Sequence, residues 1–253
     1  MATVRTEDRG GGVRVMTLDR PPANTIAPEL MNDMVAALKA AREDNSVRAV
    51  VLTGAGKFFS GGLDLRQTTN AADLGALLLD SGRDAWLDLL AFPKPMIGML
   101  TGHAIAGGLI NFLACEYRLG VEGDYKIGLN EVAIGASLPK VAFEIVRLRL
   151  THQQASELLL GARIYPASEA VRLGVVDELL PAAGFEDEVM RRAAKLGSHP
   201  KGAYAHTKAA LLKETVQRVM AETREEAESG AAVWMEPESM AARMAQAQKL
   251  GKA

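Results

Sequence analysis

Apolar residues change their spacing along the first 190 residues, and this change predicts an alternation of strands and helices. Residues 13–19 (VRVMTLD) alternate with a period of two, as in a half-buried strand. Residues 47–54 (VRAVVLTG) form an apolar run that ends in glycine, which is typical of a buried strand. Between them, residues such as Leu30 and Met34 recur at three- and four-residue steps, so residues 27–43 are expected to form an amphipathic helix.

The same alternation continues toward the middle of the chain. The expected elements are a helix near 71–91, a strand over 95–102, a helix over 107–115 and a strand over 117–122. Strands that alternate with helices favour an α/β fold with right-handed crossovers.

Beyond about residue 140, strand signals nearly vanish and helical ones dominate. Thr151 is a good N-cap and Gly161 a good stop for one helix, and residues 166–174 predict a short second one. Further helices are expected over 185–198, 203–228 and 238–250. We therefore divide the chain into an α/β core over 1–190 and a helical region over 191–253, without a linker that marks an independent domain.

The helical region carries apolar side chains that need a partner surface: Trp234, Met235, Met240, Met244 and Leu250. They can pack on the core of their own chain or on another subunit. Both alternatives stay open from the sequence, and we take oligomerisation as the working hypothesis.

Composition narrows the class of protein. The 253 residues are 48% hydrophobic and 24% charged with a net charge of −2, which is typical of a soluble globular protein with no attraction to nucleic acid or membranes. No apolar run approaches the roughly 18 residues of a membrane span, and the N-terminus lacks the apolar core of a signal peptide. The single cysteine, Cys115, fits a cytoplasmic location and an inert buried thiol, and the four histidines show no metal-ligand spacing.

Two glycine-rich turns are candidates for chemistry. KFFSGGLDL (57–65) and GHAIAGGLIN (102–111) each follow an expected strand. Paired glycines at such a junction allow backbone N–H groups to point into a cleft and a ligand to approach closely. Two N–H groups from separate loops suit an oxyanion that develops on a carbonyl group, although either turn alone is more often a tight connection.

A third feature is an isolated carboxylate. Glu131 lies among apolar and glycine residues in YKIGLNEVAIG (125–135). Burying a charge costs several kcal/mol unless the group is paired or functional. Glu131 is thus a cap, an ion-pair partner or the acid of an active site.

Taken in order, five motifs resemble the crotonase superfamily of enoyl-CoA hydratases and isomerases over residues 10–182. They read DRPPANTI, FFSGGLDL, GHAIAGG, GLNEVAIG and ASEAVRLGVVDELLP. The resemblance implies a spiral of ββα units, a C-terminal helical region that assembles a trimer or a dimer of trimers, and an acyl-CoA thioester as ligand. Coenzyme A is then part of the substrate, and no separate cofactor or metal is expected.

By position, the resemblance implies roles for particular residues. The N–H groups of Leu63 and Gly107 would form the oxyanion hole, beside Gly62 and Gly108. Basic side chains near the CoA adenine and phosphates would be those of Lys57 and Arg66, for which a solvated surface charge is an equal alternative.

The departures from the family pattern are informative. Hydratases of this family use two glutamates, and the first position is Ile110 here while the second is Glu131. One carboxylate with an apolar partner resembles the branch that isomerises 3-enoyl-CoA to 2-enoyl-CoA, because a single base can move a proton from C2 to C4. Hydration by Glu131, alone or with Glu144, and acyl-CoA binding without turnover remain alternatives.

Three other residues are interpreted as structural. Glu144 is expected to pair with Arg147 or a neighbouring helix rather than face the site. Asp64 is expected to hold its own loop, and His103 to make a structural hydrogen bond.

Overall fold

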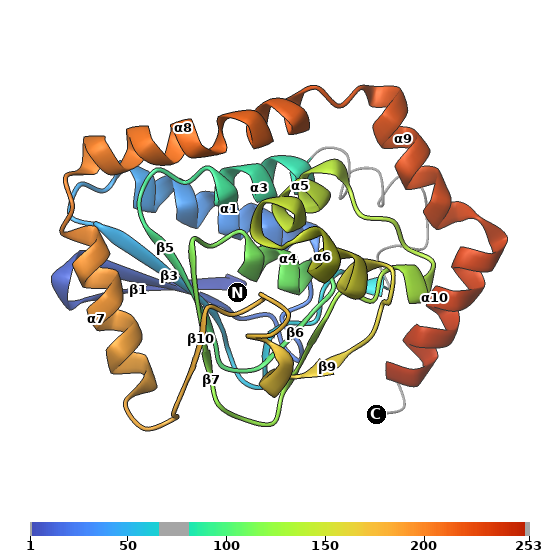
Figure 1. Cartoon of the computed structure of the whole chain (residues 1–253), viewed down its shortest axis with the longest axis horizontal. Coiled ribbons are helices and arrows are strands. Elements are labelled where there is room, and N and C mark those ends of the chain that lie inside the picture. Colours follow the sequence, from blue (N-terminus) through green and yellow to red (C-terminus); the bar gives the residue numbers. More distant parts are fainter. Residues whose placement is uncertain (1, 66–80, 251–253) are drawn as a thin grey trace.

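The computed structural model describes residues 2–65 and 81–250, and their core is a six-stranded sheet (Figure 1). Its strands in spatial order are β1 (Val4–Arg9), β2 (Val13–Leu18), β3 (Ala49–Gly54), β5 (Met96–Leu100), β7 (Tyr117–Val121) and β10 (Glu178–Leu180). β1 is antiparallel to β2, and every later pair in the sheet is parallel. This sheet confirms the expected α/β class.

A second sheet of four short strands continues from the first. It consists of β4 (Phe58–Ser60), β6 (His103–Ile105), β8 (Lys126–Gly128) and β9 (Tyr165–Pro166). β3, β5 and β7 of the first sheet lead directly to β4, β6 and β8 of the second, and these three are parallel neighbours. Strand, strand and then helix is the ββα unit that the resemblance implied. The short strands of the second sheet were not predicted, because three residues between glycines are too short to show a period of two.

Helices cover both faces of the six-stranded sheet (Figure 1). The largest hydrophobic core lies on one face of the sheet. The helices on that face are α1 (Pro28–Glu43), α3 (Ser81–Leu90), α4 (Gly107–Leu113), α5 (Lys140–Arg149) and α6 (His152–Leu159). Alternate residues of β3 point to opposite faces, so Val50 and Leu52 join this core while Val51 faces α7 (Phe185–Gly197). Burial on both faces explains why β3 is continuously apolar.

The C-terminal region packs on its own chain. α8 (Lys201–Met220) lies across the layer of α1, α3 and α5, and α9 (Arg224–Ala232) and α10 (Pro237–Leu250) then run along one side of the molecule (Figure 1). A 3₁₀ turn, η6 (Val233–Met235), joins α9 to α10 and buries Trp234 at 2% exposure. Trp234 therefore has its partner surface within the chain, while Met244 remains 60% exposed.

Most expected helices are present, with two corrections. The prediction of a helix over 166–174 was wrong, since only the 3₁₀ turn η5 (Ala167–Glu169) forms there. The helix expected over 203–228 is broken near Thr223, which caps α9 by accepting a hydrogen bond from the N–H of Glu226. The expected helix near 71–91 lies partly outside the described residues, and α3 is its described part.

Candidate active site

Three loops meet at one edge of the second sheet, because each follows the carboxyl end of one of three neighbouring parallel strands. β4 leads to the loop of Gly62 and Leu63, β6 leads to Gly107 at the start of α4, and β8 leads to Glu131. The last two loops are joined directly, since the N–H of Ala106 donates to the carbonyl of Gly128 at 2.8 Å. Segments far apart in sequence are thereby brought together, and the three predicted catalytic residues lie on them.

The two glycine loops touch in a way that requires glycine. Gly62 has a φ of +83°, and a Cβ there would lie 2.8 Å from the Cβ of Ala106 and 3.3 Å from the nitrogen of Gly107. A Cβ on Gly108 would lie 2.3 Å from the carbonyl oxygen of Ser60. The backbones therefore approach more closely than any side chain would allow.

Both predicted oxyanion donors are available. The backbone groups on either side of Leu63 are used, since the carbonyl of Gly62 accepts from Ile26 at 2.7 Å and the N–H of Asp64 donates to Ile26 at 2.9 Å. The N–H groups of Leu63 and Gly107 donate to no acceptor within the described chain. Gly107 opens a helix, where first-turn N–H groups have no intrahelical partner.

A strained residue precedes the second donor. Ala106 adopts φ 53° and ψ −134°, a conformation that costs a non-glycine residue about 1–3 kcal/mol. This turn sets the direction of the Gly107 N–H as the chain leaves β6 for α4. Strain of this kind persists where the surrounding contacts hold it, here the Gly62 loop and the hydrogen bond to Gly128.

Glu131 is a buried carboxylate without a partner among the residues that the structure describes. The residue is 6% exposed, and neither Oε1 nor Oε2 has a hydrogen-bond partner in the described part of the protein. Burial raises the pKa of Glu131 from 4.5 to about 7, because the charged form loses its hydration. A carboxylate with this pKa is a much stronger base than an ordinary one and can exchange protons near neutral pH.

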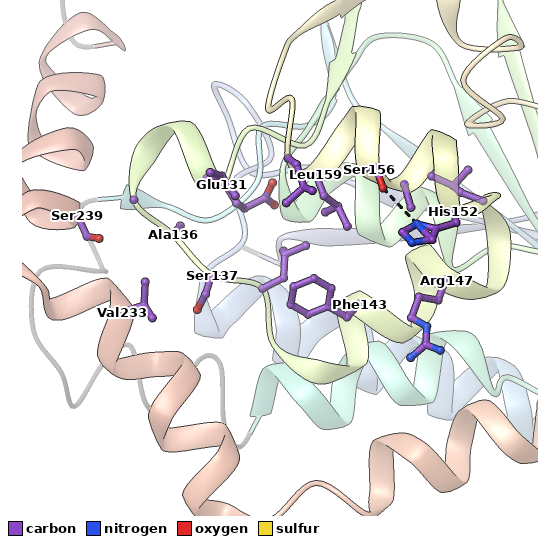
Figure 2. A pocket seen from close by; sticks show the side chains of 16 residues that line it. Glu131, Ala136, Ser137, Phe143, Arg147, His152, Ser156, Leu159, Val233 and Ser239 are labelled. Carbon is purple, nitrogen blue, oxygen red and sulfur yellow. Dashed lines mark hydrogen bonds between the residues drawn. The ribbon is translucent and has the colours of Figure 1, made fainter.

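A cavity of about 770 Å³ opens beside Glu131 (Figure 2). Its walls come from the loop after Glu131, from α5 and α6 and from the C-terminal region; they include Leu138, Phe143, Leu159 and Val233. Figure 2 shows the Glu131 carboxylate at one side of this space, with His152 and Ser156 on α6 across from it. Those two side chains interact with each other at 3.2 Å between Oγ and Nδ1. The volume falls in the usual range of small-molecule sites, roughly 300–1,000 Å³.

Glu144 does not supply a second carboxylate to this cavity. It is 1% exposed and pairs with Arg147 at 3.0 Å and with Arg218 of α8 at 2.7 Å. The expectation of an ion pair is confirmed, and the alternative in which Glu144 assists Glu131 finds no support in this geometry.

The remaining predicted ligand contacts lie away from the cavity or outside the described residues. Lys57 is exposed beside β4 and does not line the cavity. Gly108 and Ile110 lie fully buried within α4, Ile110 in the main core. Arg66 lies outside the described residues. The ligand-binding roles of these four residues stay predictions.

Three residues interpreted as structural are so placed. Asp64 is 4% exposed and pairs with Arg20 at 3.1 Å, which ties its loop to the segment after β2. The Nδ1 of His103 accepts from the N–H of Lys126 at 2.9 Å. Burial raises the pKa of the Cys115 thiol to about 12, so this cysteine is inert at neutral pH.

Sequence reasoning missed residues of the C-terminal region that contact the Glu131 loop. Trp234 was noted only as an apolar residue in need of a partner. Arg243 carried no signal, because it donates to backbone carbonyls, and the one on the Glu131 loop, Gly135, lies 108 positions earlier. Among the described residues, no cluster of histidine, cysteine or acidic side chains could hold a metal ion. No helix in residues 2–65 and 81–250 is long and apolar enough to span a membrane.

Comparison with known proteins gives a consistent result. The model of the enoyl-CoA hydratase/isomerase family matches residues 8–239. Human mitochondrial enoyl-CoA delta isomerase 1 is 29% identical over 216 residues, covering 84% of this chain and 72% of the human protein. A putative enoyl-CoA hydratase of Thermus thermophilus is 32% identical over 210 residues, covering 80% of this chain and 81% of the relative. The crystal structure of human mitochondrial delta3-delta2-enoyl-CoA isomerase matches with a TM-score of 0.93 at 25% identity, covering 99% and 98% of the two chains.

Proposed function

Because this chain belongs to the enoyl-CoA hydratase/isomerase family and is an enzyme of the crotonase fold, we propose that it isomerises 3-enoyl-CoA to 2-enoyl-CoA with Glu131 as the single acid–base. The observation that carries this proposal is the buried Glu131 carboxylate, unpartnered within the described chain, on the wall of the cavity. Coenzyme A is part of the substrate, and no separate cofactor is required.

The first step places negative charge on the thioester oxygen. Glu131 removes a proton from C2, and the electrons move onto the carbonyl to form a dienolate. The N–H groups of Leu63 and Gly107 receive this charge, and one such donor is worth roughly 3 to 4 kcal/mol in comparable sites. Their lack of other acceptors in the described chain means that no internal hydrogen bond is broken when the substrate binds.

The second step returns the proton at C4. The protonated Glu131 donates to C4 of the dienolate, which leaves the double bond between C2 and C3 and regenerates the carboxylate. One group can perform both transfers because a pKa near 7 makes the acid and the base forms similarly accessible.

The acyl chain beyond C4 is proposed to extend into the cavity. The apolar side chains of Leu138, Phe143 and Leu159 suit an aliphatic chain, whose burial contributes about 0.8 kcal/mol for each methylene group. The CoA portion would lie on the other side of the oxyanion donors, toward Lys57, which is exposed beside β4.

Water addition is the competing reaction, and it is suppressed for a structural reason. The position of the first hydratase glutamate is occupied by Ile110, a fully buried residue of the main core. No carboxylate stands there to hold a water molecule against C3. Relatives named as hydratases make hydration the second candidate, working with Glu131 alone.

Product analysis tests the proposal. The enzyme would be incubated in deuterated water with 2-enoyl-CoA and 3-enoyl-CoA, and the products identified by mass spectrometry and NMR. We expect interconversion of the two enoyl isomers with little hydroxyacyl-CoA. Hydroxyacyl-CoA as the main product would establish hydration, and tight acyl-CoA binding without any turnover would indicate a binding protein.

A homotrimer or a dimer of trimers is proposed for the assembly. Apolar side chains at the mouth of the cavity remain exposed in the single chain, Val132 at 57%, Phe143 at 40% and Leu160 at 74%. A patch of this kind commonly marks an interface.

A further inference from the structure

The C-terminal region binds the backbone of the Glu131 loop at several points. The Arg243 guanidinium of α10 donates to the carbonyl of Gly135 at 2.7 Å and to the carbonyl of Trp234. Arg243 is 6% exposed, and its guanidinium lies over the Trp234 ring at 5.0 Å. One buried cation thus joins α10, η6 and the loop four residues after Glu131.

Two further hydrogen bonds reach the same loop. The Trp234 Nε1–H donates to the carbonyl of Ser137 at 2.9 Å. The Ser137 hydroxyl in turn donates to the carbonyl of Gly230 in α9 at 2.5 Å. Figure 2 shows Val233 and Ser239 of this region facing Ala136 and Ser137.

Apolar packing extends these contacts to the oxyanion loop. Trp234 forms a small cluster with Ile134 and Ala136, and Leu63 packs against it. The fit is tight, since a Cβ on Gly135 would lie 2.3 Å from the Cα of Ser239. The C-terminal region therefore touches both the loop of the base and the loop of one oxyanion donor.

The position of the base depends on this support, because no described residue holds its carboxylate directly. Neither oxygen of Glu131 has a hydrogen-bond partner among the described residues, so the backbone of the loop must set the position of the side chain. The loop itself is short, with the Glu131 carbonyl accepting from the N–H groups of Ile134 and Ala136 at 3.0 and 2.9 Å.

We propose that Arg243 and Trp234 are positioning residues that fix Glu131 relative to the oxyanion donors, so that the C-terminal region is part of the catalytic unit of its own chain. This inference rests on the proposed role of Glu131. The C-terminal region, for which the sequence analysis predicted a role in oligomerisation, would then also position the catalytic base.

The test replaces Arg243 in two steps. Arg243→Met keeps the apolar stem but removes all donors, and Arg243→Lys keeps the charge and a donor without the planar fork. Arg191→Lys is the matched control, because Arg191 is 63% exposed and pairs with Glu188 on α7. Trp234→Phe removes the Nε1–H while retaining an aromatic ring.

We expect kcat for 3-enoyl-CoA to fall by roughly 10- to 100-fold in Arg243→Met, since a misplacement of about 1 Å can cost on the order of 10²-fold. KM should change little, because thioester binding does not use the Glu131 carboxylate. Arg243→Lys should recover part of the loss, Trp234→Phe should lose kcat less severely than Arg243→Met, and Arg191→Lys should match the wild type.

Thermal unfolding of each variant shows whether it is folded, and kinetic constants are compared only between folded variants. A folded Arg243→Met with wild-type kcat, or a loss carried entirely by KM, would overturn the positioning role. A separate result, full isomerase activity in Glu131→Gln, would contradict the proposed function itself. Inactive Glu131→Gln together with fully active Arg243→Met would therefore reject only the positioning role.

Discussion

At the scale of single residues, the two buried carboxylates Glu131 and Glu144 differ in their surroundings. Glu144 is 1% exposed and bound by two arginines, whereas Glu131 is 6% exposed and its oxygens have no partner in the described chain. Two guanidinium groups balance the charge of Glu144, whereas no side chain of the described residues balances that of Glu131. Two matched substitutions follow.

Glu131→Gln should stabilise the protein at neutral and higher pH while it abolishes isomerisation. Burial raises the pKa of Glu131 to about 7 in the folded state, against 4.5 for an ordinary glutamate, so the wild type loses stability as pH rises through this window. The difference should be on the order of 3 kcal/mol above pH 7 and should vanish near pH 4.5. Urea unfolding at several pH values measures it, and a wild-type protein more stable than the variant at pH 8 would contradict it.

Glu144→Gln should destabilise the protein while it leaves isomerisation nearly unchanged. Removing the charge leaves Arg147 and Arg218 without their partner, but these side chains are 63% and 40% exposed and regain water. We expect a loss of about 1–3 kcal/mol in unfolding free energy, with kcat nearly unchanged. A large loss of kcat in folded Glu144→Gln would instead indicate that Glu144 takes part in the reaction as a second carboxylate.

Residue identities singled out Glu131 as an isolated acid in an apolar loop, and the resemblance to the crotonase superfamily predicted its catalytic role. Neither was enough for Arg243 or Ala106. Arg243 donates to the carbonyl of Gly135, 108 positions earlier, and the strained Ala106 lies where the Gly62 loop approaches closely. Such contacts depend on tertiary structure that no local pattern encodes.

At the scale of elements, the site is a consequence of three short parallel strands that end at one edge. The long strands were predictable from period and apolar runs, whereas β4, β6 and β8 have three residues each and fall in glycine-rich turns. The sequence indicated the turns correctly but not the strands within them. Their parallel pairing is what turns three separate motifs into one site.

Glycine substitutions test this geometry. Gly62→Ala should destabilise the protein by about 1–3 kcal/mol and lower kcat, because φ is +83° and the added Cβ meets Ala106 and the carbonyl of Ile105 at 2.8 and 2.9 Å. Gly56→Ala is the matched control, since Gly56 has a similar φ of +71° and its Cβ would meet nothing within 4 Å. Thermal unfolding and kcat measure both, and equal effects of the two would count against the loop contact.

At the scale of the whole molecule, the cavity is formed by elements that lie far apart in the sequence. The cavity of about 770 Å³ is bounded by α5, α6 and the loop after Glu131, with the C-terminal region closing one side. The α/β class was predictable from the alternation of strand and helix signals, and the ββα spiral from the resemblance of five motifs to the crotonase superfamily. The cavity was not, because its walls come from helices whose mutual packing the sequence does not specify.

Leu159→Trp should shorten the acyl chain that the enzyme accepts, since Leu159 lines the cavity and the larger ring fills space meant for methylene groups. We expect kcat/KM for a dodecenoyl-CoA to fall at least about tenfold, while that for a hexenoyl-CoA changes little. Equal losses for both chain lengths would place the acyl chain elsewhere.

The oligomeric state is a separate expectation at this scale. Light scattering after size exclusion should give the mass of three or six chains, because Phe143 and Leu160 leave an apolar patch uncovered in the single chain. A stable monomer at micromolar concentration would contradict the proposed trimer but would leave the proposed reaction mechanism unaffected.

The most direct measurement is the rate of conversion of 3-enoyl-CoA to 2-enoyl-CoA by wild-type enzyme and by Glu131→Gln, with thioester affinity measured on the same samples. Glu131 as the single acid–base predicts that conversion disappears in Glu131→Gln while acyl-CoA still binds, since the Leu63 and Gly107 donors remain in place. Conversion at the wild-type rate by folded Glu131→Gln would contradict this role.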